Sequence, residues 1–279
     1  MSAGGALSGT TILVTGITDE GSLALAIARE LSAQGAKLAC AGLGPTPYHG
    51  SLSPRATQYL ATAWASFQQA VATLKADALI LPFDAKLDAS VTAMAAELAR
   101  CGRVVDGVVH AIAMDPTIRR GSVAPLLAVT REEFLECLDV SAYSLLALVR
   151  ALLEAQVLRH GASVVTLSYI GAARVPPHPY RNIAVAKAAL ERLALEMADD
   201  LGRSHGMRVN TIRFSPWSSS RAGGAIGGLG DAMLAANARS PLGNAQPEDL
   251  AREVAHLMQP SLRVTGEVRH VDGGFHGLA

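Results

Sequence analysis

The chain has 279 residues, half of them apolar and only 17% charged, and its 24 basic side chains balance 24 acidic ones. A neutral balance argues against a nucleic-acid or anionic-membrane binder that works through a broad basic field. No apolar run approaches the ~18 residues of a membrane-spanning helix, and no secretory signal is predicted at the start. The cysteines (Cys40, Cys101, Cys137) are far apart, so we expect free thiols in a reducing cytoplasm.

Short apolar runs alternate with longer helical patterns along the whole chain. The runs that predict strands are 10–15, 36–41, 78–83, 106–111, 162–167, 207–212 and 267–271. The segments that predict helices are 22–34, 57–75, 88–101, 130–156, 182–203 and 247–257. The strands are apolar on both sides, as parallel strands covered by helices on both faces are. We therefore expect one α/β domain over residues 1–279, a doubly wound parallel sheet of the Rossmann type.

Two loose segments interrupt this alternation. Residues 42–60 are rich in Gly, Pro and Ser and follow the second predicted strand, and the Ser/Gly-rich segment 215–230 follows the sixth. Open α/β sheets bind their ligands at the carboxyl ends of strands, so both segments are expected beside the ligand site.

The turn after the first strand, "VTGITDEGSLALAIA", has the composition of a phosphate-binding turn. Gly16 closes the strand, and Ser22 and Leu23 open a helix whose free N–H groups and dipole suit a pyrophosphate. Asp19 and Glu20 oppose an anion unless they point to solvent, and an ordinary strand–turn–helix junction is the alternative interpretation.

Two more strand ends favour a dinucleotide. Asp84 follows the third strand, where a carboxylate can accept from an adenine amino group, and Ala111 and Ala113 leave room for a ribose after the fourth. The second strand ends "CAGLG", with no acid for a ribose 2′-OH and no base for a 2′-phosphate. The absence of a basic side chain at this strand end favours NAD, without excluding NADPH.

A tyrosine and a lysine are the candidate catalytic residues. Tyr180 precedes Lys187 by seven residues, which places them about 20° apart around a helix axis. Ile183 occupies the position four before the lysine, where most reductases with this sheet have their tyrosine, and it cannot donate a proton. An ordinary keto-reductase is therefore disfavoured. Tyr169 lies eighteen residues before Lys187.

The chain resembles the enoyl-acyl-carrier-protein reductase branch of the short-chain dehydrogenase/reductase superfamily. The matching motifs are G-x5-S-L-A from Gly16, Tyr-x6-Lys at Tyr180, "LSYIG" around Tyr169, "DVSAYS" at 139–144 and "HVDGGF" at 270–275. The resemblance covers the chain from about residue 8 to the end. The loop after the second strand and the segment after the sixth resemble plant and apicomplexan members more than short bacterial ones.

The resemblance implies hydride transfer from a nicotinamide to the β-carbon of a trans-2-enoyl thioester carried by acyl carrier protein or CoA. Tyr180 is then the phenol that stabilises the enolate, Lys187 the group on the nicotinamide ribose, and Tyr169 part of the pocket wall. Substrate is expected at Met114, Tyr169 and Tyr180. NADH is expected at Gly16, Ile17, Ser22, Leu23, Leu43, Asp84, Ala85, Ala111, Ile112, Ala113, Lys187, Pro216, Trp217 and Ser218. The 215–230 segment is expected to form a mobile lid.

The chain also departs from the family. Tyr169 and Tyr180 are eleven residues apart where relatives usually show ten, with three prolines in the interval. Arg213 and Phe214 replace small residues after the sixth strand, which suits a specialised substrate, and Trp217 is bulky beside the nicotinamide position.

Three functions remain open on the sequence: an enoyl-thioester reductase of fatty-acid or secondary-metabolite biosynthesis, another reductase or cyclase of this fold acting on C=O or C=N, and a non-catalytic dinucleotide sensor. The apolar faces of 130–156 and 182–203, with the resemblance, imply a homotetramer. No metal site is expected, because the histidines lack metal-ligand spacing.

Overall fold

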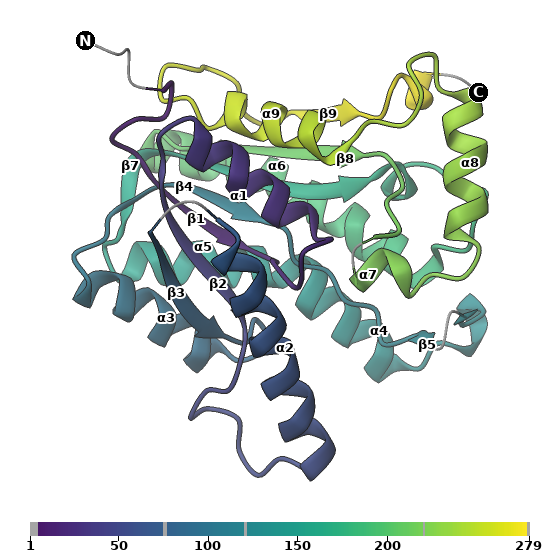
Figure 1. The fold of residues 1–279 in the computed structure, drawn as a ribbon, viewed down its shortest axis with the longest axis horizontal. Coiled ribbons are helices and arrows are strands. Elements are labelled where there is room, and N and C mark those ends of the chain that lie inside the picture. Colours follow the sequence, from purple (N-terminus) through teal and green to yellow (C-terminus); the bar gives the residue numbers. More distant parts are fainter. Residues whose placement is uncertain (1–4, 75–76, 120–121, 220, 278–279) are drawn as a thin grey trace.

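The computed structural model describes residues 5–74, 77–119, 122–219 and 221–277, and its centre is one twisted sheet (Figure 1). Its seven strands stand in the order β3 (Ala78–Phe83), β2 (Lys37–Leu43), β1 (Thr11–Thr15), β4 (Val105–His110), β7 (Leu158–Tyr169), β8 (Arg208–Phe214) and β9 (Val268–Val271). Every neighbouring pair is parallel. The predicted doubly wound parallel sheet is confirmed.

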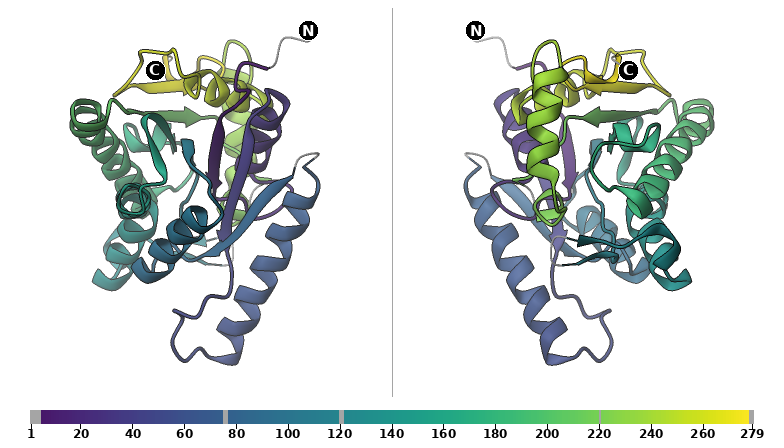
Figure 2. Two further views of the ribbon diagram at one scale, coloured as in Figure 1. Left: turned by 90° about the vertical axis from the view of Figure 1, so that its left-hand side faces the viewer. Right: turned by 90° about the vertical axis from the view of Figure 1, so that its right-hand side faces the viewer.

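Helices cover both faces of this sheet (Figure 2). One face packs against α1 (Leu23–Ala33), α2 (Pro54–Ala72) and α9 (Pro247–Leu257), and the other against α3 (Asp88–Arg100), α5 (Ser144–Glu154) and α6 (Arg181–His205). Each layer has its own apolar core, which is why the strands are apolar on both sides. In Figure 2 the loop after β2 and α2 project from the body of the molecule.

The predicted elements agree with the structure to within a few residues, with three corrections. The helix expected over 130–156 is divided into α4 (Arg131–Leu138), a π-helical turn (Asp139–Tyr143) and α5. The segment 215–230, expected to be loose, contains α7 (Arg221–Gly224) and the start of α8 (Leu229–Arg239). A small hairpin, β5 (Ile118–Arg119) with β6 (Ser122–Val123), was not predicted. The expected end of the second helix, residue 75, lies outside the described residues.

Local signals explain where the helices begin and end. Pro54 stands in the first turn of α2, and Ser53 before it accepts from the N–H of Ala56. Gly206 ends α6 in the left-handed conformation, the usual helix stop. In the described ranges, no helix is long and apolar enough to cross a bilayer.

Candidate active site

The first turn and the end of β4 meet so closely that only glycine fits between them. Gly16 has a φ of +89°, and a Cβ added there would lie 2.2 Å from the carbonyl oxygen of Ala111. A left-handed φ and a backbone contact both require glycine. The sequence-predicted residues of these two strand ends are therefore brought together. Ile17 departs from the expectation in part, because its side chain is buried in the core and leaves only its backbone for a ligand.

The amino end of α1 offers backbone N–H groups to an anion. The hydroxyl of Ser22 donates to the carbonyl of Asp19 at 2.8 Å, so no side chain caps the first turn of the helix. The Asp19 carboxylate turns back into the loop, where it accepts from the N–H of Gly21 at 3.0 Å. Glu20 points to solvent, as an anion site requires. The turn therefore fits a pyrophosphate, with the helix dipole favouring it.

Trp217 joins the segment after β8 to this turn. Its indole N–H donates to the carbonyl of Gly21 at 3.1 Å, and a Cβ on Gly21 would lie 2.1 Å from the carbonyl oxygen of Ser219. The bulky side chain therefore braces the predicted cofactor turn. Pro216 is buried and Ser218 half-buried beside it.

The carboxyl ends of β2 and β3 carry a pair that the sequence did not predict. His49, in the loop after β2, has its Nε2 3.1 Å from Oδ2 of Asp84, the expected adenine partner. The other carboxylate oxygen accepts from the N–H of Lys86 at 2.9 Å. Leu43 and Ala85 are half-buried at the same edge. The carboxylate at which an adenine amino group is expected is therefore already bound to His49.

Lys187 lies between the ends of β4 and β7. The side chain is buried, and its Nζ donates to the carbonyls of Leu167 at 2.8 Å and Ile112 at 3.4 Å. Burial lowers the pKa of Lys187 to about 8, partly offset by nearby acidic groups that include Glu191. The ammonium group is therefore held over the strand ends where a nicotinamide ribose is expected.

The residues around Glu191 explain one departure from the family. Arg213 binds the carboxylate of Glu191 with two hydrogen bonds, of 2.8 and 2.5 Å, and Ser168 donates to the same carboxylate at 2.6 Å. Both charged side chains are largely buried. Glu191 lies one turn after Lys187 on α6. The ion pair and the serine hydrogen bond therefore connect β8 and β7 to α6 close to Lys187.

Tyr169 and Tyr180 lie together despite their longer spacing. Their ring centroids are 5.0 Å apart in an edge-to-face arrangement, and Tyr180 packs against Gly171, where a Cβ would lie 2.4 Å from its ring. Burial raises the pKa of both phenols, and in Tyr180 the neighbouring Tyr169 adds to the effect. Both stay protonated at neutral pH and are able to donate a hydrogen bond.

Asp115 fixes the start of the helix that carries this site. Its buried carboxylate accepts from the backbone N–H of Ile183 at 3.1 Å and from the side-chain amide of Asn182 at 3.2 Å. A carboxylate at a helix amino end satisfies free N–H groups and the dipole. Tyr180 immediately precedes the first helical residue, so this cap sets the relative position of Tyr180 and Lys187.

The loop after β4 is hydrogen-bonded to the π-helical turn. Ser141 accepts from the N–H of Met114 and donates to its carbonyl, both at 2.9 Å. Ser144 lies 2.8 Å from the Nε2 of the fully buried His110, whose pKa is lowered to about 3 by burial and by the nearby Lys187 charge. Met114, the expected substrate contact, is therefore rigidly placed by the "DVSAYS" stretch, a role the sequence did not predict.

A cluster at the carboxyl end of β9 contains no predicted site residue. His270, Asp272 and His276 have ligand atoms within 4.8 Å of one another, a grouping that the sequence spacing did not predict. Asp272 accepts from the N–H groups of Gly274 and His276 and lies 2.9 Å from Nδ1 of His276, whereas Nδ1 of His270 has no hydrogen-bond partner among the described residues.

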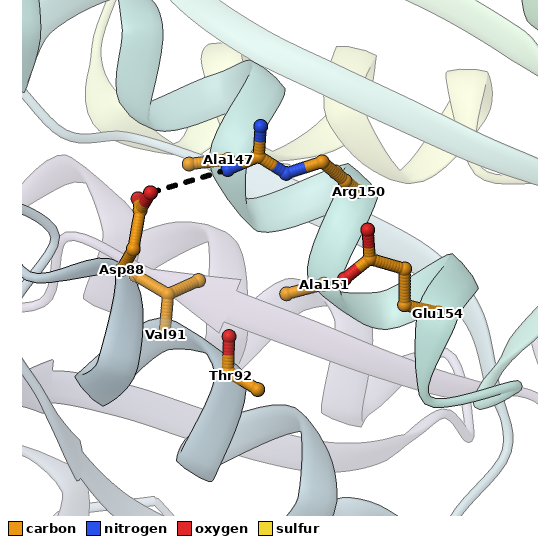
Figure 3. A pocket seen from close by; sticks show the side chains of 7 residues that line it. All are labelled: Asp88, Val91, Thr92, Ala147, Arg150, Ala151 and Glu154. Atoms are coloured by element: carbon orange, nitrogen blue, oxygen red, sulfur yellow. Dashed lines mark hydrogen bonds and ion pairs between the residues drawn. The ribbon is translucent and has the colours of Figure 1, made fainter.

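A surface groove of about 310 Å³ between α3 and α5 contains no predicted site residue (Figure 3). Arg150 lies 3.4 Å from Asp88 across it. The remaining lining residues are Val91, Thr92, Ala147, Ala151 and Glu154. The groove is thus a polar surface feature, separate from the strand ends that gather the predicted residues.

The chain is similar to known enoyl reductases over nearly its whole length. The family model described as "Enoyl-(Acyl carrier protein) reductase" matches residues 16–276. The enoyl-[acyl-carrier-protein] reductase [NADH] FabI of Salmonella typhimurium is 35% identical over 97% of this chain and 95% of its own length, and that of Bacillus subtilis is 33% identical over 97% of both.

Solved structures of the same enzymes have the same fold. The FabI–NADH complex of Alistipes finegoldii has a TM-score of 0.83 and 27% identity over 98% of this chain and 90% of its own. The Bacillus cereus enoyl-acyl carrier protein reductase with NADP+ and indole naphthyridinone has a TM-score of 0.83 and 29% identity over 99% of both chains. The chain therefore belongs to the enoyl-(acyl carrier protein) reductase family.

Proposed function

We propose that this chain reduces the carbon–carbon double bond of a trans-2-enoyl thioester, with NADH as the hydride donor. The observation that carries the proposal is the pair of adjoining phenols, Tyr169 and Tyr180, at the strand ends beside Lys187. Ile183 is buried at the position where a keto-reductase has its tyrosine. The relatives are named as NADH-dependent enoyl reductases, which supports the same activity here.

The residues of this chain suit that reaction. When bound, NADH supplies a hydride to the β-carbon, and negative charge then develops on the thioester oxygen. Tyr180, a half-buried phenol that stays protonated, donates a hydrogen bond to that oxygen and stabilises the charge. Tyr169 forms the neighbouring wall and, with Met114, confines the acyl chain beside the reacting carbons.

Other residues hold the cofactor. The ammonium of Lys187 exchanges a backbone partner for a ribose hydroxyl, and the free N–H groups of α1 bind the pyrophosphate. Trp217 braces the turn between them, and Asp84 receives the adenine amino group. The end of β2 supplies no base for a 2′-phosphate, so we propose NADH over NADPH, although one similar structure contains NADP+.

We further propose that the whole chain works as one catalytic domain of a homotetramer in a reducing cytoplasm, on acyl-carrier-protein or CoA thioesters of fatty-acid or related biosynthesis. The sheet uses strands from both ends of the chain, and the three cysteines are free. Large apolar side chains are exposed on and before α4, in the π-helical turn and on α6: Leu126, Leu127, Leu135, Tyr143, Val185 and Leu195. Light scattering of the purified protein measures the assembly directly.

The test follows NADH and NADPH loss at 340 nm with crotonyl and longer trans-2-enoyl thioesters, in wild type and Tyr180→Phe. Wild type is expected to turn over an enoyl thioester with NADH, and the variant to bind NADH normally with kcat reduced about 100-fold or more. Turnover of ketones alone would favour another reductase of this fold. Cofactor binding without turnover of any enoyl thioester would favour a sensor and refute the proposal.

A further inference from the structure

His178 is a buried histidine without hydrogen bonds. Its side chain is 5% exposed, and in the part of the chain that the structure describes neither Nδ1 nor Nε2 has a partner. Hydrogen-bonding groups that lose water without gaining a partner cost free energy, so an imidazole with two of them calls for an explanation.

The position of this imidazole supplies one. Its ring centroid lies 5.5 Å from that of Tyr169 and 5.9 Å from that of Tyr180, edge-to-face with the latter. The three rings form one cluster, and the two phenols also lack a hydrogen bond to any described residue. A buried imidazole without hydrogen bonds thus lies against the two phenols, where the thioester is proposed to react.

The residues around His178 restrict its backbone conformation and so the position of its ring. Pro177 and Pro179 flank it, and a residue before proline is confined to extended backbone conformations. The same segment contains the additional residue between the two tyrosines. Val175 and Pro177 are exposed on the surface, so the ring lies under a thin, stiff stretch of chain rather than deep in the core.

We propose that His178 donates a hydrogen bond to the thioester carbonyl oxygen alongside Tyr180. A carbonyl oxygen has two lone pairs, so a phenol O–H and an imidazole N–H bind it together without competing. Burial lowers the pKa of His178, which keeps the ring neutral and leaves one N–H to donate. This inference rests on the proposed enoyl reduction and adds a second donor to its oxyanion site.

The kinetic test compares His178→Phe with His160→Phe, a change of an exposed histidine in β7. The first is expected to lower kcat/KM for crotonyl-CoA about 100-fold while NADH affinity and melting temperature stay near wild type; the second leaves all three unchanged. In His178→Ala, added imidazole is expected to restore part of kcat. Activity of His178→Phe within threefold of wild type would overturn the proposal, as would an equal loss of NADH affinity or no rescue by imidazole.

A second measurement does not depend on turnover. Protein with ¹⁵N-labelled histidine is titrated with butyryl-CoA in the presence of NAD⁺, and the His178 signal is assigned by its loss in His178→Phe. A shift of that signal to the values of a hydrogen-bonded neutral imidazole is expected. If wild type reduces enoyl thioesters and the signal does not move, the role of His178 is wrong and the proposed function stands. If wild type reduces none, the proposed function fails first, and the inference fails with it.

Discussion

Replacing Lys187 by methionine separates the cost of burying its charge from its use in cofactor binding. The structure places the ammonium in a buried site with two backbone carbonyls and lowers its pKa from 10.5 to about 8. A fall of about 2.5 in the pKa, at about 1.4 kcal/mol for each pKa unit, means that the charged form costs the folded state about 3.5 kcal/mol. Methionine avoids this cost because it carries no charge. The gain offsets the loss of the two hydrogen bonds that methionine cannot make, each worth about 1 kcal/mol.

The two pKa values of Lys187 determine whether its contribution to stability rises or falls with pH. Below pH 8 the lysine is protonated in both states and the full cost is present. Between pH 8 and 10.5 the folded state releases its proton first, so the unfolded state binds more protons and stability rises with pH. The free energy of unfolding of wild type relative to Lys187→Met should therefore rise by about 2 kcal/mol between pH 7 and pH 9.5.

The assay is urea unfolding followed by tryptophan fluorescence, at equal protein concentration and at both pH values. A parallel titration is expected to show NADH affinity reduced at least tenfold in Lys187→Met. A difference in unfolding free energy that stays constant from pH 7 to 9.5 would show that the lysine is not held charged in a buried site.

Three further changes test the supporting geometry. Trp217→Phe removes the hydrogen bond to the cofactor turn and should raise KM for NADH about 5-fold with kcat nearly unchanged, in steady-state kinetics. Asp115→Ala leaves the amino end of α6 without its cap and should lower the unfolding free energy by about 2–4 kcal/mol. Asp115→Asn still accepts a hydrogen bond, so its loss of unfolding free energy should be smaller. Equal losses in the two variants would contradict the capping role. Gly16→Ala and Gly9→Ala both place alanine at a left-handed φ, but only the first meets the carbonyl of Ala111, so only the first should abolish NADH binding in fluorescence titrations.

The sheet was predictable because its signals are local. Strands such as β1 and β2 are apolar or small at nearly every position, and this pattern is typical of strands that helices cover on both faces. The π-helical turn inside the expected helix was not predictable, because its sequence has no glycine or proline to interrupt a helix and tertiary contacts of Ser141 and Ser144 select it. Serine and glycine in 215–230 predicted a loop, and packing overrides that preference in α7 and α8.

The site divides in the same way. The positions of Gly16, Tyr180 and Lys187 were predictable because these residues stand at fixed spacings from a strand end or from one another, while their roles stay predictions. The partners of His49 and Asp115 lie 35 and 68 residues away in the chain, and no periodic pattern predicts such contacts. His178 has no spacing signal either, since its significance comes from burial and from two neighbouring rings.

The central claim is hydride transfer to the β-carbon, and isotope transfer measures it directly. Wild type is incubated with crotonyl-CoA and NADH that carries two deuterium atoms at C4, and the product is analysed by mass spectrometry and NMR. The account predicts one deuterium at C3 of butyryl-CoA for each NADH consumed. NADH consumption without deuterium at C3, or no reduction of the double bond at all, would contradict it.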